Sequence, residues 1–130
     1  MQSSEIARKG YKTIQKEMGS DAELELKIFS DITGRLSRFD PKRLGQASDF
    51  YQAVYENAQL WNILYIDLIQ SENQLEESLK ANLISLAIFV TTHTPKVLSG
   101  DEGHQVLVDI NRNIIDGKRA FLLALSETAA

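Results

Sequence analysis

The chain has 130 residues, the length of one domain, and a domain of this size buries roughly two thirds of the surface that its unfolded chain exposes. A content of 43% hydrophobic and 25% charged residues is that of a globular protein and excludes global disorder. The net charge of −4 argues against a general nucleic-acid binder, because such proteins carry an excess of Lys and Arg. The absence of cysteine excludes a disulfide framework and a thiolate metal site.

The helical spacing of apolar residues, at three- and four-residue steps almost throughout, predicts an all-α, single-domain helical bundle of about five helices. Residues 5–16 carry only a thin apolar stripe of Ile6, Tyr11 and Ile14, so this N-terminal arm would bury little surface. Its start lacks the basic and apolar regions of a secretory signal. The most apolar segment, 83–90, is too short to cross a bilayer, and we expect a cytoplasmic protein.

A second helix is expected to begin at Ser20, where Ser20 and Glu23 fit a capping box. Its inward face would carry Leu24, Ile28, Ile32 and Leu36. This helix should end before Pro41, because the residue that precedes a proline is disfavoured in helical geometry.

A third helix can open at Pro41 with Asp40 as its cap, and Gly45 can split it. From Ser48 the spacing becomes strong. One stripe contains Phe50, Val54, Ala58, Trp61, Tyr65 and Leu68, and further apolar residues cover the neighbouring faces: Leu60, Ile63, Leu64 and Ile66. This pattern predicts a helix that is buried on more than one side.

The polar segment 70–74 suits a tight turn between helices, and a fourth helix should follow from about Leu75. Two apolar stripes predict that it is the central helix, which Pro95 ends or kinks before a turn at Ser99–Asp101. The last helix should start at Glu102 or His104, with an inward stripe of Leu107, Ile110 and Ile114. Gly117 would cap it or allow close helix packing. We expect an arm at 1–19, a helical domain at 20–118 and a helical extension or tail at 119–130.

No pattern indicates a metal site, a cofactor or an enzyme. His93 and His104 lack the spacing that puts two ligands on one helical face, and no nucleophile elbow, phosphate loop or dinucleotide fingerprint is present. Four carboxylates near one helix start could be paired acids, but the field of a helix N-terminus explains them more simply: Asp67, Glu72, Glu76 and Glu77.

Two polar groups are candidate contact sites. The basic group of Arg35, Arg38, Lys42 and Arg43 could contact RNA or an acidic partner, although a solvated helix end is the favoured explanation. In the last helix, Asp109 and Arg112 can pair, and Asn111 and Asn113 can bond to backbone. A polar clasp between this helix and the turn after Gln70 is the structural alternative to a ligand contact, and Trp61 is expected to anchor the core.

Several phrases taken together resemble the FlaF family of flagellar biosynthesis regulators, over roughly Ser20 to Lys118. They are Leu60-Trp61-Asn62-Ile63-Leu64, Asp67-Leu68, Glu72-Asn73-Gln74-Leu75, Leu83 to Val90, and Asp109-Ile110-Asn111-Arg112-Asn113-Ile114. One departure is Glu76, where similar proteins often carry proline. The residues expected to form the structural and partner-contact signature are Trp61, Asp67, Asn73, Asn82, Asp109, Asn111 and Arg112.

The resemblance implies a nonenzymatic role in flagellin production and export, beside the translational regulator FlbT and with flagellin as the bound partner. The physical hypothesis is an apolar groove that takes an amphipathic terminal helix of flagellin and shields it before export. An alternative is an RNA-linked regulator that binds FlbT or flagellin mRNA through the basic group. A general helical scaffold is a third alternative, and the oligomeric state is left open.

Overall fold

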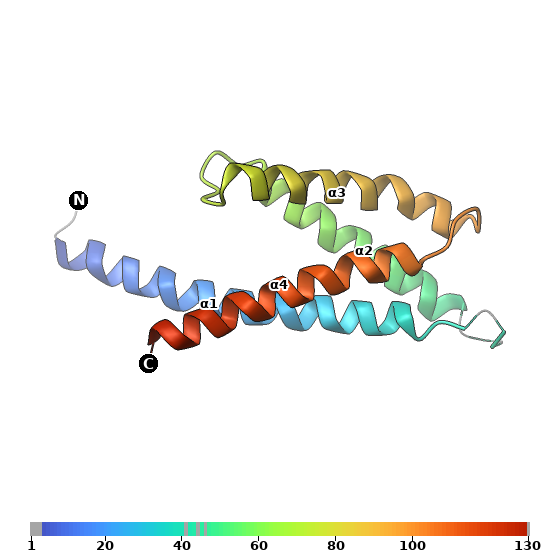
Figure 1. Ribbon diagram of the computed structural model, residues 1–130, viewed down its shortest axis with the longest axis horizontal. Helices are drawn as coiled ribbons and strands as arrows, with labels where there is room; N and C mark the ends of the chain where they lie inside the picture. Colours follow the sequence, from blue (N-terminus) through green and yellow to red (C-terminus); the bar gives the residue numbers. More distant parts are fainter. Residues whose placement is uncertain (1–3, 41, 44, 46, 130) are drawn as a thin grey trace. The chain divides into compact units, whose positions relative to one another are not determined.

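The computed structural model describes residues 4–40, 42, 43, 45 and 47–129, with side chains outside the description at 4–20, 125, 128 and 129. Across these residues it has four α-helices and no β-strand (Figure 1). The all-α prediction is therefore confirmed, with four helices where about five were expected. Within the described ranges, no helix combines the length and the apolar character needed to cross a bilayer.

Helix α1 spans Ser4–Ser37 without a break, which accounts for the difference in helix number. The expected helix start at Ser20 is wrong, because α1 runs through it. The residues between the two predicted segments are Glu17, Met18 and Gly19; Glu and Met favour helix, and α1 continues through Gly19 despite the low helix propensity of glycine. The helix ends ahead of Pro41, as predicted.

Contacts divide the chain into two compact units, one of Ile32–Ile110 and one of Met1–Asp31 with Asn111–Ala130. The predicted division at residues 19 and 118 stays a prediction.

The Ile32–Ile110 unit is built on a helical hairpin of α2, Ala47–Leu68, and α3, Glu77–Leu98. The two helices run side by side in opposite directions and pack against each other (Figure 1). The buried residues of α2 are Phe50, Ala53, Val54, Asn57, Trp61 and Leu68, and those of α3 are Ala87, Val90, Thr94 and Val97. Trp61 is fully buried, and truncation of such a side chain to Ala typically costs about 3–5 kcal/mol.

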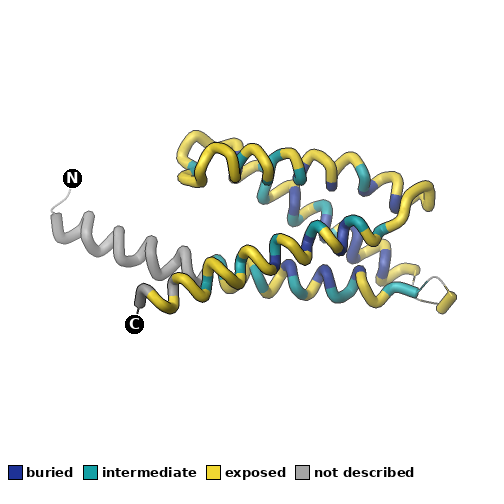
Figure 2. Tube along the Cα trace, viewed as in Figure 1, coloured by how far each residue is buried: buried dark blue, intermediate teal, exposed yellow. Residues whose placement is uncertain are grey.

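Helix α3 is not the central helix that its two apolar stripes predicted. Leu79, Ile88, Phe89 and Leu98 are all about half exposed, and exposed positions continue along most of α3 (Figure 2). Of the second stripe, Ile84, Ala87 and Ile88, only Ile88 is exposed, whereas Ala87 is buried and Ile84 is half-buried. A helix that is apolar on two faces does not reveal from its own sequence which face has a neighbour.

The start of α2 and the end of α3 both differ from the prediction: α2 begins later than expected, and α3 ends later. Helix α2 begins only at Ala47, after Gly45 with φ 89°, and the proposed first residue Pro41 lies outside the described residues. Helix α3 continues through Pro95 for one more turn, so of the two predicted effects of Pro95 the ending of the helix is wrong, and a kink stays a prediction. The amides of Ser99 and Gly100 then donate to Pro95 O and Val97 O, at 3.0 and 3.1 Å, and close the predicted turn.

Helix α4 spans Gln105–Ala129. Its first turns bury Leu107 and Val108 in the Ile32–Ile110 unit, whereas the predicted inward residue Ile110 is only half-buried. Gly117 lies inside the helix and a Cβ there would meet nothing within 4 Å, so it neither caps the helix nor admits a neighbour.

In the unit formed by Met1–Asp31 and Asn111–Ala130, a cation joins α4 to α1. The Nζ of Lys118 forms an ion pair with the carboxylate of Glu25 and lies 5.4 Å from the ring centroid of Phe29. Phe29 and Ile115 are buried here, while Leu24 and Leu123 are more than half exposed. The predicted inward residue Leu24 therefore faces solvent.

Candidate functional site

The solvent face of α2 carries a strip of large apolar side chains. We call Tyr51, Tyr55, Ile63 and Ile66, together with Ile69 directly after the end of α2, the α2 strip; each is between 48% and 67% exposed. At 100° per residue they fall within an arc of about 120° on the side opposite the buried face. Exposed apolar side chains gathered on one side of a helix can mark an interaction site, so the α2 strip is a candidate interaction surface.

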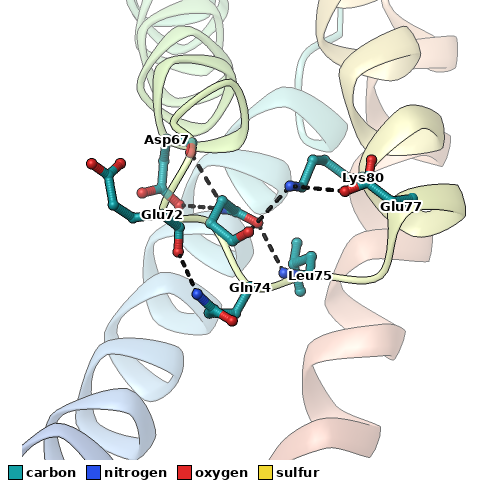
Figure 3. A network of polar contacts seen from close by, with 7 residues as sticks. Asp67, Glu72, Gln74, Leu75, Glu77 and Lys80 are labelled. Atoms are coloured by element: carbon teal, nitrogen blue, oxygen red, sulfur yellow. Dashed lines mark hydrogen bonds and ion pairs between the residues drawn. The ribbon is translucent and has the colours of Figure 1, made fainter.

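The turn between α2 and α3 is fixed by Asn73. Figure 3 shows Asp67, Leu75 and Lys80, which take part in this network. Its Nδ2 donates to Asp67 Oδ2 at 3.2 Å and to Asp67 O at 3.3 Å, and its Oδ1 accepts from the Leu75 amide at 3.0 Å. Lys80 Nζ donates to Asn73 O at 3.1 Å and lies 3.6 Å from a Glu77 oxygen. The structure thus brings Asp67 and Asn73 together, which gives these two signature residues a structural role in holding the hairpin.

The other signature residues make no hydrogen bond to Asp67 or Asn73 that the structure describes, and they differ from one another in burial. Trp61 and Asn111 are fully buried. Asn82 and Arg112 are exposed, and Asp109 accepts a hydrogen bond from Gln105 Nε2 at 3.0 Å. Trp61 therefore has the position expected of a core anchor, and a partner role for the exposed residues stays a prediction.

Three of the four predicted basic residues line one open cavity of about 600 Å³. We call it the arginine pocket; its lining residues are Arg35, Arg38, Phe39, Asp40, Arg43, Asp49, Phe50 and Gln52. The fourth basic residue, Lys42, is exposed, and its amide donates to Asp40 Oδ1 at 2.9 Å. The pocket is of mixed charge, because two aspartates stand among the arginines.

Arg35 is bound to Glu56 through two hydrogen bonds, Nη1 to Oε1 at 3.1 Å and Nη2 to Oε2 at 2.6 Å. The hydrogen bond from Arg35 lowers the pKa of Glu56 below its ordinary value of 4.5. The pair joins the end of α1 to the middle of α2 within the Ile32–Ile110 unit. It fixes one wall of the arginine pocket.

An aromatic cluster forms part of the pocket lining through Phe39 and Phe50. The rings of Phe39 and Phe50 stack with centroids 3.9 Å apart, and His104 meets them edge-on at 5.7 and 5.0 Å. Burial among these rings lowers the pKa of His104 from its ordinary 6.5, because an apolar environment disfavours the charged imidazolium. The other histidine, His93, stacks on Phe89, and its Nε2 lies 3.0 Å from Gly103 O.

The acidic residues at the start of α3 match the helix-terminus interpretation. Glu76 is the N-cap residue and Glu77 lies in the first turn, where the helix dipole favours negative charge. In the part of the chain that the structure describes, no group of three or more His, Cys, Asp or Glu residues could hold a metal ion.

A model of the FlaF family, described as "Flagellar protein FlaF", matches residues 7–117. The chain belongs to the FlaF family. The match begins earlier than the resemblance noted from Ser20, so it takes in part of the N-terminal arm. No curated protein and no solved structure matches the chain.

The FlaF match contains the complete hairpin of α2 and α3, the α2 strip and the arginine pocket. FlaF is a family of flagellar proteins and is not a known enzyme family. Sequence reasoning missed the α2 strip as a surface, since Ile63 and Ile66 were assigned to buried faces. The available signal was the i, i+4 pair of tyrosines, Tyr51 and Tyr55, in line with Ile66 and Ile69.

Proposed function

We propose that this FlaF protein binds flagellin in the cytoplasm, as a secretion chaperone that also regulates flagellin synthesis and works beside FlbT. The observation that carries the proposal is the α2 strip, an exposed apolar helix face in a member of a flagellar protein family. An amphipathic helix recognises such a surface through apolar anchors at i, i+3, i+4 and i+7. We assign the α2 strip to a terminal helix of flagellin.

Calorimetric titration with full-length flagellin and with flagellin lacking the terminal helix tests this assignment. Only the full-length protein should bind with high affinity, and the heat capacity change of binding should be negative, because apolar surface is buried. Equal affinity for both forms would contradict the assignment of the α2 strip to a terminal helix of flagellin.

Charge substitutions localise the surface. Replacement of Tyr55 and Ile66 by Glu should weaken flagellin binding by about tenfold or more, since each buries a charge in the contact. The matched control is Ile88→Glu, an equally exposed apolar residue on α3 outside the α2 strip. If Ile88→Glu weakened flagellin binding equally, the binding surface would not be the α2 strip.

An RNA-linked regulator that acts through FlbT or flagellin mRNA is the second candidate, favoured by the three arginines that line one cavity. Salt separates the two functions. Binding to RNA phosphates should weaken steeply as salt rises, whereas apolar contact with flagellin should hold or strengthen. Absence of binding to both partners would favour a general scaffold.

A further inference from the structure

We propose that the arginine pocket is a second binding site, separate from the α2 strip, that takes an acidic peptide segment of a partner protein. Carboxylates of the peptide pair with Arg38 and Arg43, and an apolar side chain beside them packs on Phe39. The proposal goes beyond flagellin binding by the α2 strip and does not depend on it.

Packed residues of α1, α2 and the start of α4 hold the arginine pocket in shape. Its lining comes from the end of α1, the following loop and the first turns of α2, all within the Ile32–Ile110 unit. The stacked rings of Phe39 and Phe50 give it an apolar surface, and His104 supports them from the start of α4. A half-buried Phe39 leaves part of this surface available to a ligand.

The arginines of the pocket differ in what they bind. Arg35 is held by both oxygens of Glu56. The side chains of Arg38 and Arg43 are exposed, and neither has an ion pair or hydrogen bond with any residue that the structure describes. A guanidinium recognises a carboxylate through two parallel N–H···O bonds, so two such groups beside an apolar ring fit an acidic residue next to an apolar one.

Charge favours a peptide over RNA. Asp40 and Asp49 line the same pocket as the arginines, and a continuous phosphate backbone would pass both carboxylates. RNA binding draws its affinity from many neutralised phosphates, which this alternation of charge disfavours. An acidic peptide has separate carboxylates with uncharged residues between them, so its charges can lie at Arg38 and Arg43 without lying beside Asp40 and Asp49.

Fluorescence anisotropy with a labelled, blocked peptide tests the site, with one phenylalanine between two aspartates as the recognition element. The full-length protein should bind it saturably, and the same peptide with asparagines should bind about tenfold more weakly, because the charge-assisted hydrogen bonds are lost. The double variant R38A/R43A should show a similar loss. The matched control is K96A/R119A, which removes two exposed cations outside the pocket and should bind normally.

Three results would overturn the proposal: no saturable binding of the acidic peptide, equal binding of the aspartate and asparagine peptides, or equal binding by the two double variants. Tighter binding of a labelled oligouridylate, with a steep salt dependence, would also overturn it in favour of RNA. Circular dichroism of each variant confirms that it is folded. Flagellin binding by R38A/R43A should be unchanged, so failure of this site and failure of the α2 strip are separate outcomes.

Discussion

Arg35 and Glu56, 21 positions apart in the chain, meet as a two-point pair in which each guanidinium Nη donates to one carboxylate oxygen. Their side chains are 28% and 33% exposed, so solvent screens much of their Coulomb attraction. The planar fork of the guanidinium contributes more than its charge, because it matches both oxygens at once.

Arg35→Lys should therefore destabilise the fold although the positive charge is retained. We expect a loss of about 0.5–1 kcal/mol in the free energy of unfolding, the upper range for an exposed ion pair. Urea denaturation measures it. The control Arg112→Lys changes an exposed arginine and should have a smaller effect; equal losses would show that the fork geometry contributes nothing.

Asn73→Ala should destabilise the hairpin by about 1–2 kcal/mol, because it removes the acceptor of the Leu75 amide and the donor to Asp67. Asn82→Ala is the matched substitution, at an exposed position of α3. Since Ala is the better helix former, it should leave stability unchanged or raise it by about 0.5 kcal/mol. Thermal unfolding of both variants gives the comparison, and a larger loss from Asn82→Ala would contradict the assigned role of Asn73.

Gly117→Ala should stabilise the protein by about 0.5–1 kcal/mol. Gly117 is a helical residue with open space around a built Cβ, so Ala gains helix propensity without a clash. Gly100→Ala should instead cost about 1–2 kcal/mol, because φ at this residue is 83°. Chemical denaturation of the two variants should give changes of opposite sign, and loss of stability in both would refute this reading of Gly117.

Stability should fall as pH drops through the ordinary His104 pKa of 6.5. In the unfolded chain His104 takes up a proton there, whereas the folded protein resists protonation because its pKa is lowered by burial. Protons therefore favour the unfolded state until pH reaches the folded pKa, below which the loss is constant. His104→Gln should flatten this part of the curve of unfolding free energy against pH; an unchanged slope would assign it to another group.

Glu56 affects stability in a lower pH range than His104 does. Its pKa lies below the ordinary 4.5, so its contribution is present above that value and is lost as pH falls through the folded pKa. Glu56→Gln should thus alter acid unfolding while leaving the His104 region of the curve in place.

The hairpin was largely predictable because its signals are local. The polar segment 70–74 marks the turn, and Phe50, Val54, Trp61 and Leu68 of the predicted stripe are buried. The continuous α1 was not predictable from a capping box, since Ser20 serves as a cap only where the preceding chain is not helical. Pro95 was similarly overestimated as a stop signal.

The candidate surfaces were less predictable, because they depend on which helices become neighbours. The basic group was recognised as a cluster, but its pairing with Glu56 joins residues far apart in sequence. The α2 strip depends on exposure, and Ile63 and Ile66 have the same composition as core residues. Periodicity shows which residues share a face without showing whether that face is covered.

The only tryptophan of the chain, Trp61, is sealed inside the Ile32–Ile110 unit, which makes the protein its own spectroscopic reporter. Its fluorescence follows the opening of this unit, whereas far-ultraviolet circular dichroism follows all four helices together. Coincident melting curves would mean that the two units unfold cooperatively. If circular dichroism changed at a lower temperature than fluorescence, an intermediate would exist in which the other unit has unfolded and Trp61 is still buried.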